Sequence, residues 1–338
     1  MKKNALFFAI LVFTASCRSG KNAPDISGIH IELKVERFDE AFFSLDTTNI
    51  QRSLFALNQR FPYFTNDFMV NILGATPLSD TSQIAFRAAR VFLTSYLPVK
   101  DSIELEFKNL DWLEKELRSS FAYIKYYFPD YQLPPKVVSY IGPFDAPAAA
   151  MTRFTLAIGL QLYAGKDFSF YKSAQGQELY PSYISRRFEP QYIRSNCMKA
   201  IADDMFPDTS SSRPLVEQMI EKGKYWWLIN QFMPDASDSL ITGFTGHQLK
   251  WCNDNEGQIW NLLLQSDIFT IDQDLIKNFL GDSPHTQGMP DSSPGNIGQW
   301  VGWQIIKKYL EKNPSINANE LMRTNSRTIF DTAKYKPK

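Results

Sequence analysis

The feature that most constrains the fold is the repeated spacing of apolar residues at intervals of three and four, the period of an α-helix. In the first half of the chain, three such stretches end directly before Pro62, Pro98 and Pro129. Because proline lacks the backbone N–H that a helix interior requires, each proline is expected to end the helix before it. The pattern predicts helices over residues 47–61, 80–97, 109–128, 190–206, 214–231, 245–268 and 297–311.

Three shorter stretches have the spacing or composition of β-strands. Residues 29–38 (IHIELKVERF) alternate apolar and polar side chains, which is typical of a half-buried strand. Residues 134–142 and 153–165 are rich in β-branched and aromatic residues and are bounded by proline and glycine. The order of elements predicts an α+β fold that is mostly helical, with an initial helical layer, a small β-sheet and a larger helical half around it.

The start of the chain has the pattern of a bacterial export signal. Two lysines are followed by an apolar run over residues 5–15, and small residues directly precede Cys17. As a helix, this run would reach only about 16 Å, roughly half of the hydrocarbon core of a bilayer. We therefore predict that residues 1–16 are a lipoprotein signal peptide and that Cys17 is acylated. The alternative is an ordinary signal peptide with an incidental cysteine.

Acylation of Cys17 would anchor the chain to a lipid bilayer. Each buried methylene group contributes about 0.8 kcal/mol, so two or three acyl chains hold a protein on a membrane essentially permanently. Residues 17–27 are predicted to be a flexible tether, and residues 28–338 a single globular domain. No acidic run follows Cys17, so we expect the periplasmic side of the cell envelope, with the outer membrane favoured.

Composition limits the classes of molecule that the chain is expected to bind and bears on the redox state of its cysteines. The 36 basic and 36 acidic residues cancel, so no overall charge attracts the chain to nucleic acid. After Cys17 no apolar run is long enough to span a bilayer. Cys197 and Cys252 could form a disulfide outside the cytoplasm, but both fall on apolar faces of helical patterns, where buried free thiols are common. The sequence is compatible with a disulfide between Cys197 and Cys252 and with two free thiols.

Familiar catalytic and metal-binding motifs do not fit the sequence. Gly159 and Gly165 are separated by five residues, one more than a phosphate-binding loop has, and no G-x-S-x-G motif occurs. The three histidines, at positions 30, 247 and 285, contain no pair at the helical spacing of a zinc site. The tryptophans of the C-terminal half recur with aliphatic neighbours at helical spacing, which favours an ordinary core over carbohydrate stacking. Gly298 and Gly302 lie one helical turn apart, which would let another backbone come close.

Six segments, in order, resemble the gliding-motility lipoprotein GldB family over about residues 26–337. They are ISGIHIELKVERFDEAFF, IGLQLYAGKDFSFY, RRFEPQYIRSNCMKAI, LVEQMIEKGKYWWLINQFMPDASDSLITGFT, HQLKWCNDNEGQIWNLLLQSDIF and SPGNIGQWVGWQIIKKYLEKN. The resemblance implies a periplasm-facing lipoprotein of gliding Gram-negative bacteria, required for movement over surfaces, with other gliding or secretion proteins as partners. His247 departs from the family pattern, where an acidic residue precedes Gln248.

A weaker resemblance is to zinc peptidases of the gluzincin kind. Glu221 and Gly223 match the second element of their metal site, but the helix predicted over residues 190–206, which should carry H-E-x-x-H, contains no histidine. A carboxylate without its two imidazole partners does not hold zinc usefully, so no metal and no other cofactor is expected. We interpret the arrangement as a degenerate, zincin-like scaffold. Glu221 beside Lys222 or opposite Arg194 is then a vestigial site or a structural ion pair.

These observations support three hypotheses for the function. The first, which we favour, is a non-catalytic scaffold or adaptor of the gliding apparatus, held on the membrane by its lipid. The second is a hydrolase that acts on peptides or cell wall through a site without a familiar motif. The third is a lipoprotein that binds peptidoglycan or another glycan through exposed aromatic side chains.

Overall fold

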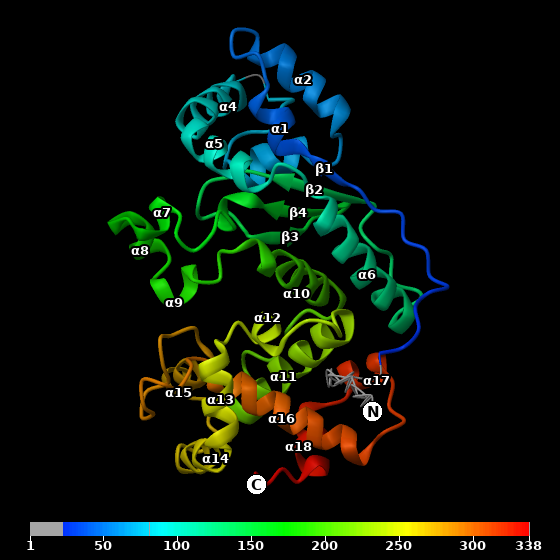
Figure 1. Ribbon diagram of the computed structural model, residues 1–338, viewed down its shortest axis with the longest axis vertical. Coiled ribbons are helices and arrows are strands. Elements are labelled where there is room, and N and C mark those ends of the chain that lie inside the picture. The colour runs from blue at the N-terminus through cyan, green and yellow to red at the C-terminus, as the bar shows by residue number, and fades with distance from the viewer. Residues whose placement is uncertain (1–22, 81, 338) are drawn as a thin grey trace, which may run out of the picture.

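A small β-sheet lies between two groups of helices (Figure 1). The computed structural model describes residues 23–80 and 82–337, so the predicted signal peptide and Cys17 lie outside the described residues. In Figure 1 the helices α1 to α5 gather above the sheet, and the helices of the C-terminal half lie below it. The predicted α+β fold, mostly helical with a small sheet, is confirmed.

The sheet is mixed, with one antiparallel edge strand. Its spatial order is β1-β2-β4-β3, in which β1, β2 and β4 are parallel and β3 runs antiparallel to β4. The strands are β1 (Val35–Arg37), β2 (Lys136–Tyr140), β3 (Ala149–Met151) and β4 (Thr155–Gly159). Since successive side chains of a strand point to opposite faces, the two central strands supply two separate cores. Val137 and Leu156 pack in the larger core, and Val138 and Ala157 pack in the smaller one.

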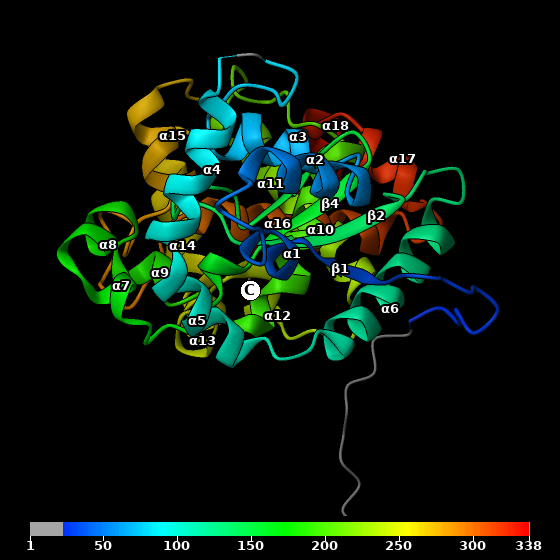
Figure 2. The ribbon, with the colours of Figure 1, turned by 90° about the horizontal axis from the view of Figure 1, so that it is seen from above.

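The smaller core is formed by the first helices and is dominated by phenylalanine. Phe38, Phe42 and Phe68 are almost fully buried, and their rings lie 4.8–5.7 Å apart between centroids. Figure 2, seen from above, looks down on these helices with the strands beneath them. The elements are α1 (Phe38–Phe43), α2 (Ile50–Arg60), α3 (Thr65–Asp67), the π-helical turn η1 (Phe68–Ile72), α4 (Ile84–Ser95) and α5 (Leu97–Glu106).

The larger core joins the other face of the sheet to the C-terminal helices. Side chains of α6 and α10 pack there against β2 and β4, and α11 and α16 extend the same core. The elements of the middle region are α6 (Asp111–Tyr127), η2 (Leu160–Leu162), α7 (Ser169–Lys172), α8 (Ala174–Leu179), α9 (Ser182–Ser185), η3 (Pro190–Tyr192) and α10 (Ile193–Met205). Those of the C-terminal region are α11 (Leu215–Phe232), α12 (Asp238–Thr242), α13 (Gly246–Asp254), α14 (Glu256–Gln265), α15 (Gln273–Leu280), α16 (Ile297–Lys312), α17 (Ala318–Arg323) and α18 (Ser326–Ala333).

The crossing of α11 and α16 brings two backbones into direct contact. A Cβ added at Gly302 would lie 1.7 Å from the carbonyl oxygen of Met219, and one added at Gly223 would lie 2.2 Å from the carbonyl carbon of Gly302. At Gly298 an added Cβ would lie 3.0 Å from the carbonyl oxygen of Phe279. The predicted close approach of another backbone at Gly298 and Gly302 is confirmed.

The strand predicted over residues 29–38 is confirmed only over Val35–Arg37, which form β1, and the residues before Val35 are not in a strand. Side chains of α6 take the place of a neighbouring strand. Arg118 Nη1 donates to the carbonyl oxygen of Leu33 at 2.9 Å, and the backbone N–H of Val35 donates to Glu114 Oε1 at 3.0 Å. The residues before Val35 therefore lie against the core, as their alternation requires, without a ladder partner.

Two predicted helix boundaries also differ. The helix predicted over residues 80–97 ends at Ser95, and Pro98 lies in the first turn of the next helix, α5, where its missing N–H has no helical partner to lose. The helix predicted over residues 245–268 is two helices, α13 and α14, that meet at Asn255. Within the described part of the chain, no helix combines the length and apolar character needed to cross a bilayer.

Candidate functional site

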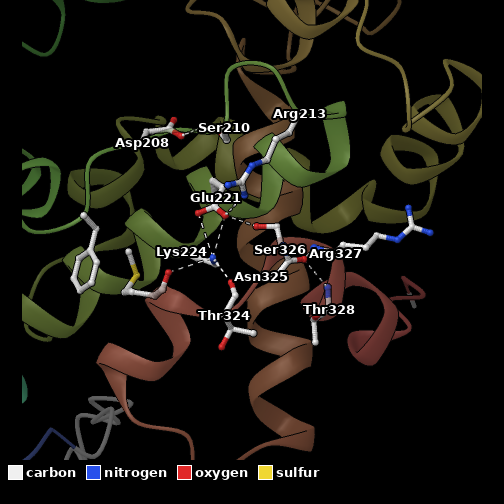
Figure 3. Close-up of polar contacts among 12 residues, drawn as sticks. Asp208, Ser210, Arg213, Glu221, Lys224, Thr324, Asn325, Ser326, Arg327 and Thr328 are labelled. Atoms are coloured by element: carbon white, nitrogen blue, oxygen red, sulfur yellow. Dashed lines mark hydrogen bonds and ion pairs between the residues drawn. The ribbon is translucent and has the colours of Figure 1, made fainter.

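Lys224 is the least exposed cation among the described residues of the C-terminal half and lies at the centre of the cluster in Figure 3. Glu221 and Lys224 lie three residues apart on α11, so their side chains share one face of the helix. Lys224 is 1% exposed, and its Nζ lies 3.1 Å from Glu221 Oε1. It also donates to the carbonyl oxygens of Thr324 at 2.6 Å and Met322 at 3.3 Å. The three protons of the ammonium group therefore all have acceptors.

Glu221 has two further partners. Ser326 Oγ donates to Glu221 Oε1 at 2.5 Å, and Arg213 Nη1 lies 3.4 Å from the same oxygen. Ser326 is the first residue of α18, and Asn325 caps that helix by accepting from the backbone N–H groups of Arg327 and Thr328 (Figure 3). The cluster thus joins α11 to the turn between α17 and α18, about a hundred residues further along the chain.

Burial lowers the pKa of the Lys224 ammonium group, and the neighbouring Glu221 carboxylate opposes this effect without cancelling it. A buried lysine with a lowered pKa beside a pocket is a common form of catalytic base or nucleophile. In this structure two carbonyl oxygens and a carboxylate accept the protons of Lys224.

A polar pocket of about 350 Å³ opens beside this cluster. Its rim carries a second ion pair, in which Lys222 Nζ lies 2.8 Å from Asp208 Oδ2. Burial raises the pKa of Asp208, but the bonds from Lys222 and Ser210 outweigh it and leave that pKa below its usual value. Tyr225 and Phe206 also line the pocket, and the Tyr225 hydroxyl donates to the carbonyl oxygen of Phe206. The lining residues Asp208, Arg213, Glu221 and Lys224 are therefore in ion pairs. Arg323, which also lines the pocket, donates to Asn319 Oδ1 at 3.0 Å instead.

Arg194 lies in a different cluster. This residue of α10 is 7% exposed and makes a two-pronged pair with Asp235, at 2.8 and 2.9 Å, while its Nε donates to Ser120 Oγ at 2.8 Å. Burial raises the pKa of the nearby Glu116, and Arg194 opposes that shift. Arg194 thus connects α6 and α10 to the loop that follows α11.

Glu221 therefore pairs with neither partner considered from the sequence, Lys222 or Arg194. Glu221 and Arg194 lie in separate ion pairs. Lys222 follows Glu221 directly, so its side chain leaves the helix about 100° away and reaches Asp208 instead. Lys224, at the i,i+3 position, is on the correct face. The motif EKGK contained this pair, but nothing local pointed to Thr324 or Ser326.

The cysteines, tryptophans and histidine considered from the sequence lie outside these clusters. Cys197 and Cys252 are buried free thiols, and burial raises the pKa of both, that of Cys252 to about 12, which keeps them neutral and unreactive. Trp300 and Trp303 are 2% exposed, as expected of core residues. His247 is exposed in the first turn of α13. Among residues 23–80 and 82–337, no three His, Cys, Asp or Glu side chains lie together as a metal ion would require.

Comparison with known proteins gives one match, which covers almost the whole chain. A family model named GldB_lipo and described as gliding motility protein GldB matches residues 19–337. No curated protein and no solved structure matches the chain. The distant resemblance to zinc peptidases receives no support from these comparisons.

Proposed function

The chain belongs to the gliding motility protein GldB family, and on that premise we propose that it is a membrane-anchored, non-catalytic scaffold or adaptor of the gliding apparatus. Its folded body, residues 28–338, faces the periplasm on a tether formed by residues 17–27. The outer membrane is the favoured location. The proposed partners are other proteins of the gliding or secretion machinery.

The observation that carries the non-catalytic role is that the two least exposed cations of the described residues, Lys224 and Arg194, already have partners. A general base, acid or nucleophile needs a lone pair or proton directed at a substrate. The donors of Lys224 and Arg194 are instead occupied by protein oxygens. We interpret Lys224 as a clamp that fastens residues 322–326 to α11, and Arg194 as a clamp between α6 and Asp235.

The main alternative is a zincin-like hydrolase acting on peptides or cell wall. Metal analysis of the purified chain separates it from the adaptor, because the first helix of a zinc site should supply two imidazoles and α10 supplies none. We expect less than stoichiometric zinc and no change in peptide or cell-wall hydrolysis after chelation. Stoichiometric zinc, lost together with a hydrolytic activity, would contradict the adaptor proposal.

The anchor has its own test, the substitution Cys17→Ala. Acyl chains attach to the sulfur and to the amine of this residue after cleavage, so the variant should incorporate no labelled fatty acid and should leave the membrane fraction. Cys252→Ala is the matched control, because Cys252 is a buried free thiol, and it should be labelled like the wild type. Labelling of Cys17→Ala at the level of this control would refute the assignment of the lipid to Cys17.

One surface feature favours a glycan-binding role as a second candidate. Tyr63 and Phe154 are 49% and 36% exposed with ring centroids 4.9 Å apart, and aromatic rings of this kind can stack on sugars. The guanidinium group of Arg153 already covers one ring, 4.9 Å from its centroid. Under the adaptor proposal, the protein stays in the supernatant when purified sacculi are sedimented. Sedimentation that Tyr63→Ser abolishes would favour the glycan-binding role.

A further inference from the structure

Residues of α2 and α4 line an open groove of about 1000 Å³. These two helices lie at the end of the molecule opposite the C-terminal helices (Figure 1). Arg52 of α2 and Arg87 and Arg90 of α4 line the groove and are exposed. Its other polar lining residues are uncharged: Thr48, Asn49, Gln51, Gln59 and Gln83. The groove is therefore a local concentration of positive charge in a chain whose overall charge is zero.

The three arginines lack the acidic helical partners that several cations elsewhere on this protein have. Lys100, Lys250 and Arg327 each pair with an acidic residue one helical turn away. Neither α2 nor α4 contains an acidic residue. Within the described residues, the guanidinium groups of the three groove arginines make no hydrogen bond or ion pair.

The nearest acidic side chains in the sequence, Asp46 and Asp80, are held in their own turns. The Asp46 carboxylate accepts from the backbone and hydroxyl of Thr48 and from the amide of Asn49. The Asp80 carboxylate accepts from the backbone of Ser82. Neither carboxylate makes an ion pair with a groove arginine at 4 Å or less.

The groove also offers apolar surface between these charges. Phe55 lies on the same face of α2 as Arg52 and is 42% exposed. The centroid of its ring lies 5.9 Å from that of the buried Phe86. On α4, Ile84 and Val91 are 49% and 60% exposed and line a neighbouring hollow that shares Arg87 with the groove. A ligand that fits both features carries carboxylates, which arginine binds with two parallel hydrogen bonds, and at least one apolar side chain.

We propose that the groove between α2 and α4 binds an acidic polypeptide segment of a partner protein, with Arg52, Arg87 and Arg90 pairing its carboxylates and Phe55 packing an apolar side chain. A concave groove between two helices suits a peptide better than a flat bilayer. In Figure 1, the first described segment, residues 23–34, runs beside α6 and below the sheet, away from α2 and α4. The binding test needs no gliding cells, so its result is independent of the proposed adaptor role.

The test measures binding of a fluorescent peptide to the purified full chain in detergent. The peptide repeats Asp-Glu-Phe-Glu over about twelve residues, which as a helix spans about 18 Å. The triple variant Arg52→Gln, Arg87→Gln, Arg90→Gln should weaken binding by at least about tenfold, since three exposed charge pairs are lost together. Its matched control is Arg153→Gln, Arg323→Gln, Arg327→Gln, which makes the same change of charge at other exposed sites and should bind like the wild type.

Two results would overturn the proposal. The first is equal peptide affinity in the wild type and the groove triple variant, or no binding to the wild type at all. The second comes from sedimentation of the non-acylated Cys17→Ala chain with vesicles of phosphatidylglycerol and phosphatidylcholine. If the vesicles carry that chain down, release it when the groove arginines are replaced, and retain it in excess peptide, the groove contacts a bilayer and not a polypeptide.

Discussion

Gly302→Ala is expected to lower the free energy of unfolding by about 3 kcal/mol or more, because its new methyl group would lie 1.7 Å from the carbonyl oxygen of Met219. That oxygen belongs to the backbone of α11, so no side-chain rotation relieves the clash, and α16 must move as a whole. The gain in helix propensity from glycine to alanine is only about 1 kcal/mol, too little to compensate.

Gly246→Ala is the matched control for this substitution. Gly246 opens α13, and an added Cβ there meets nothing within 4 Å, so the stability should stay constant or rise slightly. Urea unfolding followed by circular dichroism measures both variants. Gly223→Ala should resemble Gly302→Ala, and the double variant should cost less than the sum, because the two glycines touch each other. Equal stability of Gly302→Ala and Gly246→Ala would refute the close crossing of α11 and α16.

Lys224→Met is expected to cost about 3–5 kcal/mol, the range for removal of one partner from a buried ion pair. Methionine fills the space but leaves two buried carbonyl oxygens, those of Met322 and Thr324, without their donor. Glu221 then keeps only Arg213 and Ser326. The expected consequence is that α17 and α18 loosen from α11 before the rest of the chain unfolds, which hydrogen exchange at residues 318–333 detects.

Lys250→Met provides the comparison. Lys250 also pairs with a carboxylate on its own helix, Asp254 at 2.6 Å, but its side chain is 73% exposed. Exposed pairs of this kind contribute less than about 1 kcal/mol. The double variant Glu221→Gln, Lys224→Met should recover part of the loss caused by Lys224→Met, because no buried carboxylate is left with too few partners. If Lys224→Met is no less stable than Lys250→Met, Lys224 is not a clamp.

The long helices were predictable from the sequence because apolar residues recur in them at helical spacing over several turns. The predicted stretches 109–128, 214–231 and 297–311 match α6, α11 and α16 to within two residues. The extent of the strand within residues 29–38 was not predictable, since alternation reports which side chains are buried and not which groups the backbone hydrogen-bonds to. Here Glu114 and Arg118 of α6 take those bonds.

The candidate site was predictable only in part, for a similar reason. Glu221 could be singled out from the sequence, and the i,i+3 spacing to Lys224 is local information that the motif EKGK contained. Thr324 and Ser326 lie about a hundred residues away, and they meet Lys224 and Glu221 only because α11 packs against α16 and α18. Contacts of that kind depend on tertiary packing, which no local pattern encodes.

The central claim is that Glu221, Lys224 and Arg194 stabilise the fold and take no part in catalysis. The most direct test measures, for each variant, the gliding speed and the amount of folded protein in the envelope. Gly302→Ala and Gly246→Ala leave the polar clusters intact, so they define the curve that relates gliding speed to the amount of folded protein. We predict that Glu221→Gln, Lys224→Met and Arg194→Lys fall on the same curve. A Glu221→Gln protein that is folded at wild-type abundance in cells that do not glide would contradict the account.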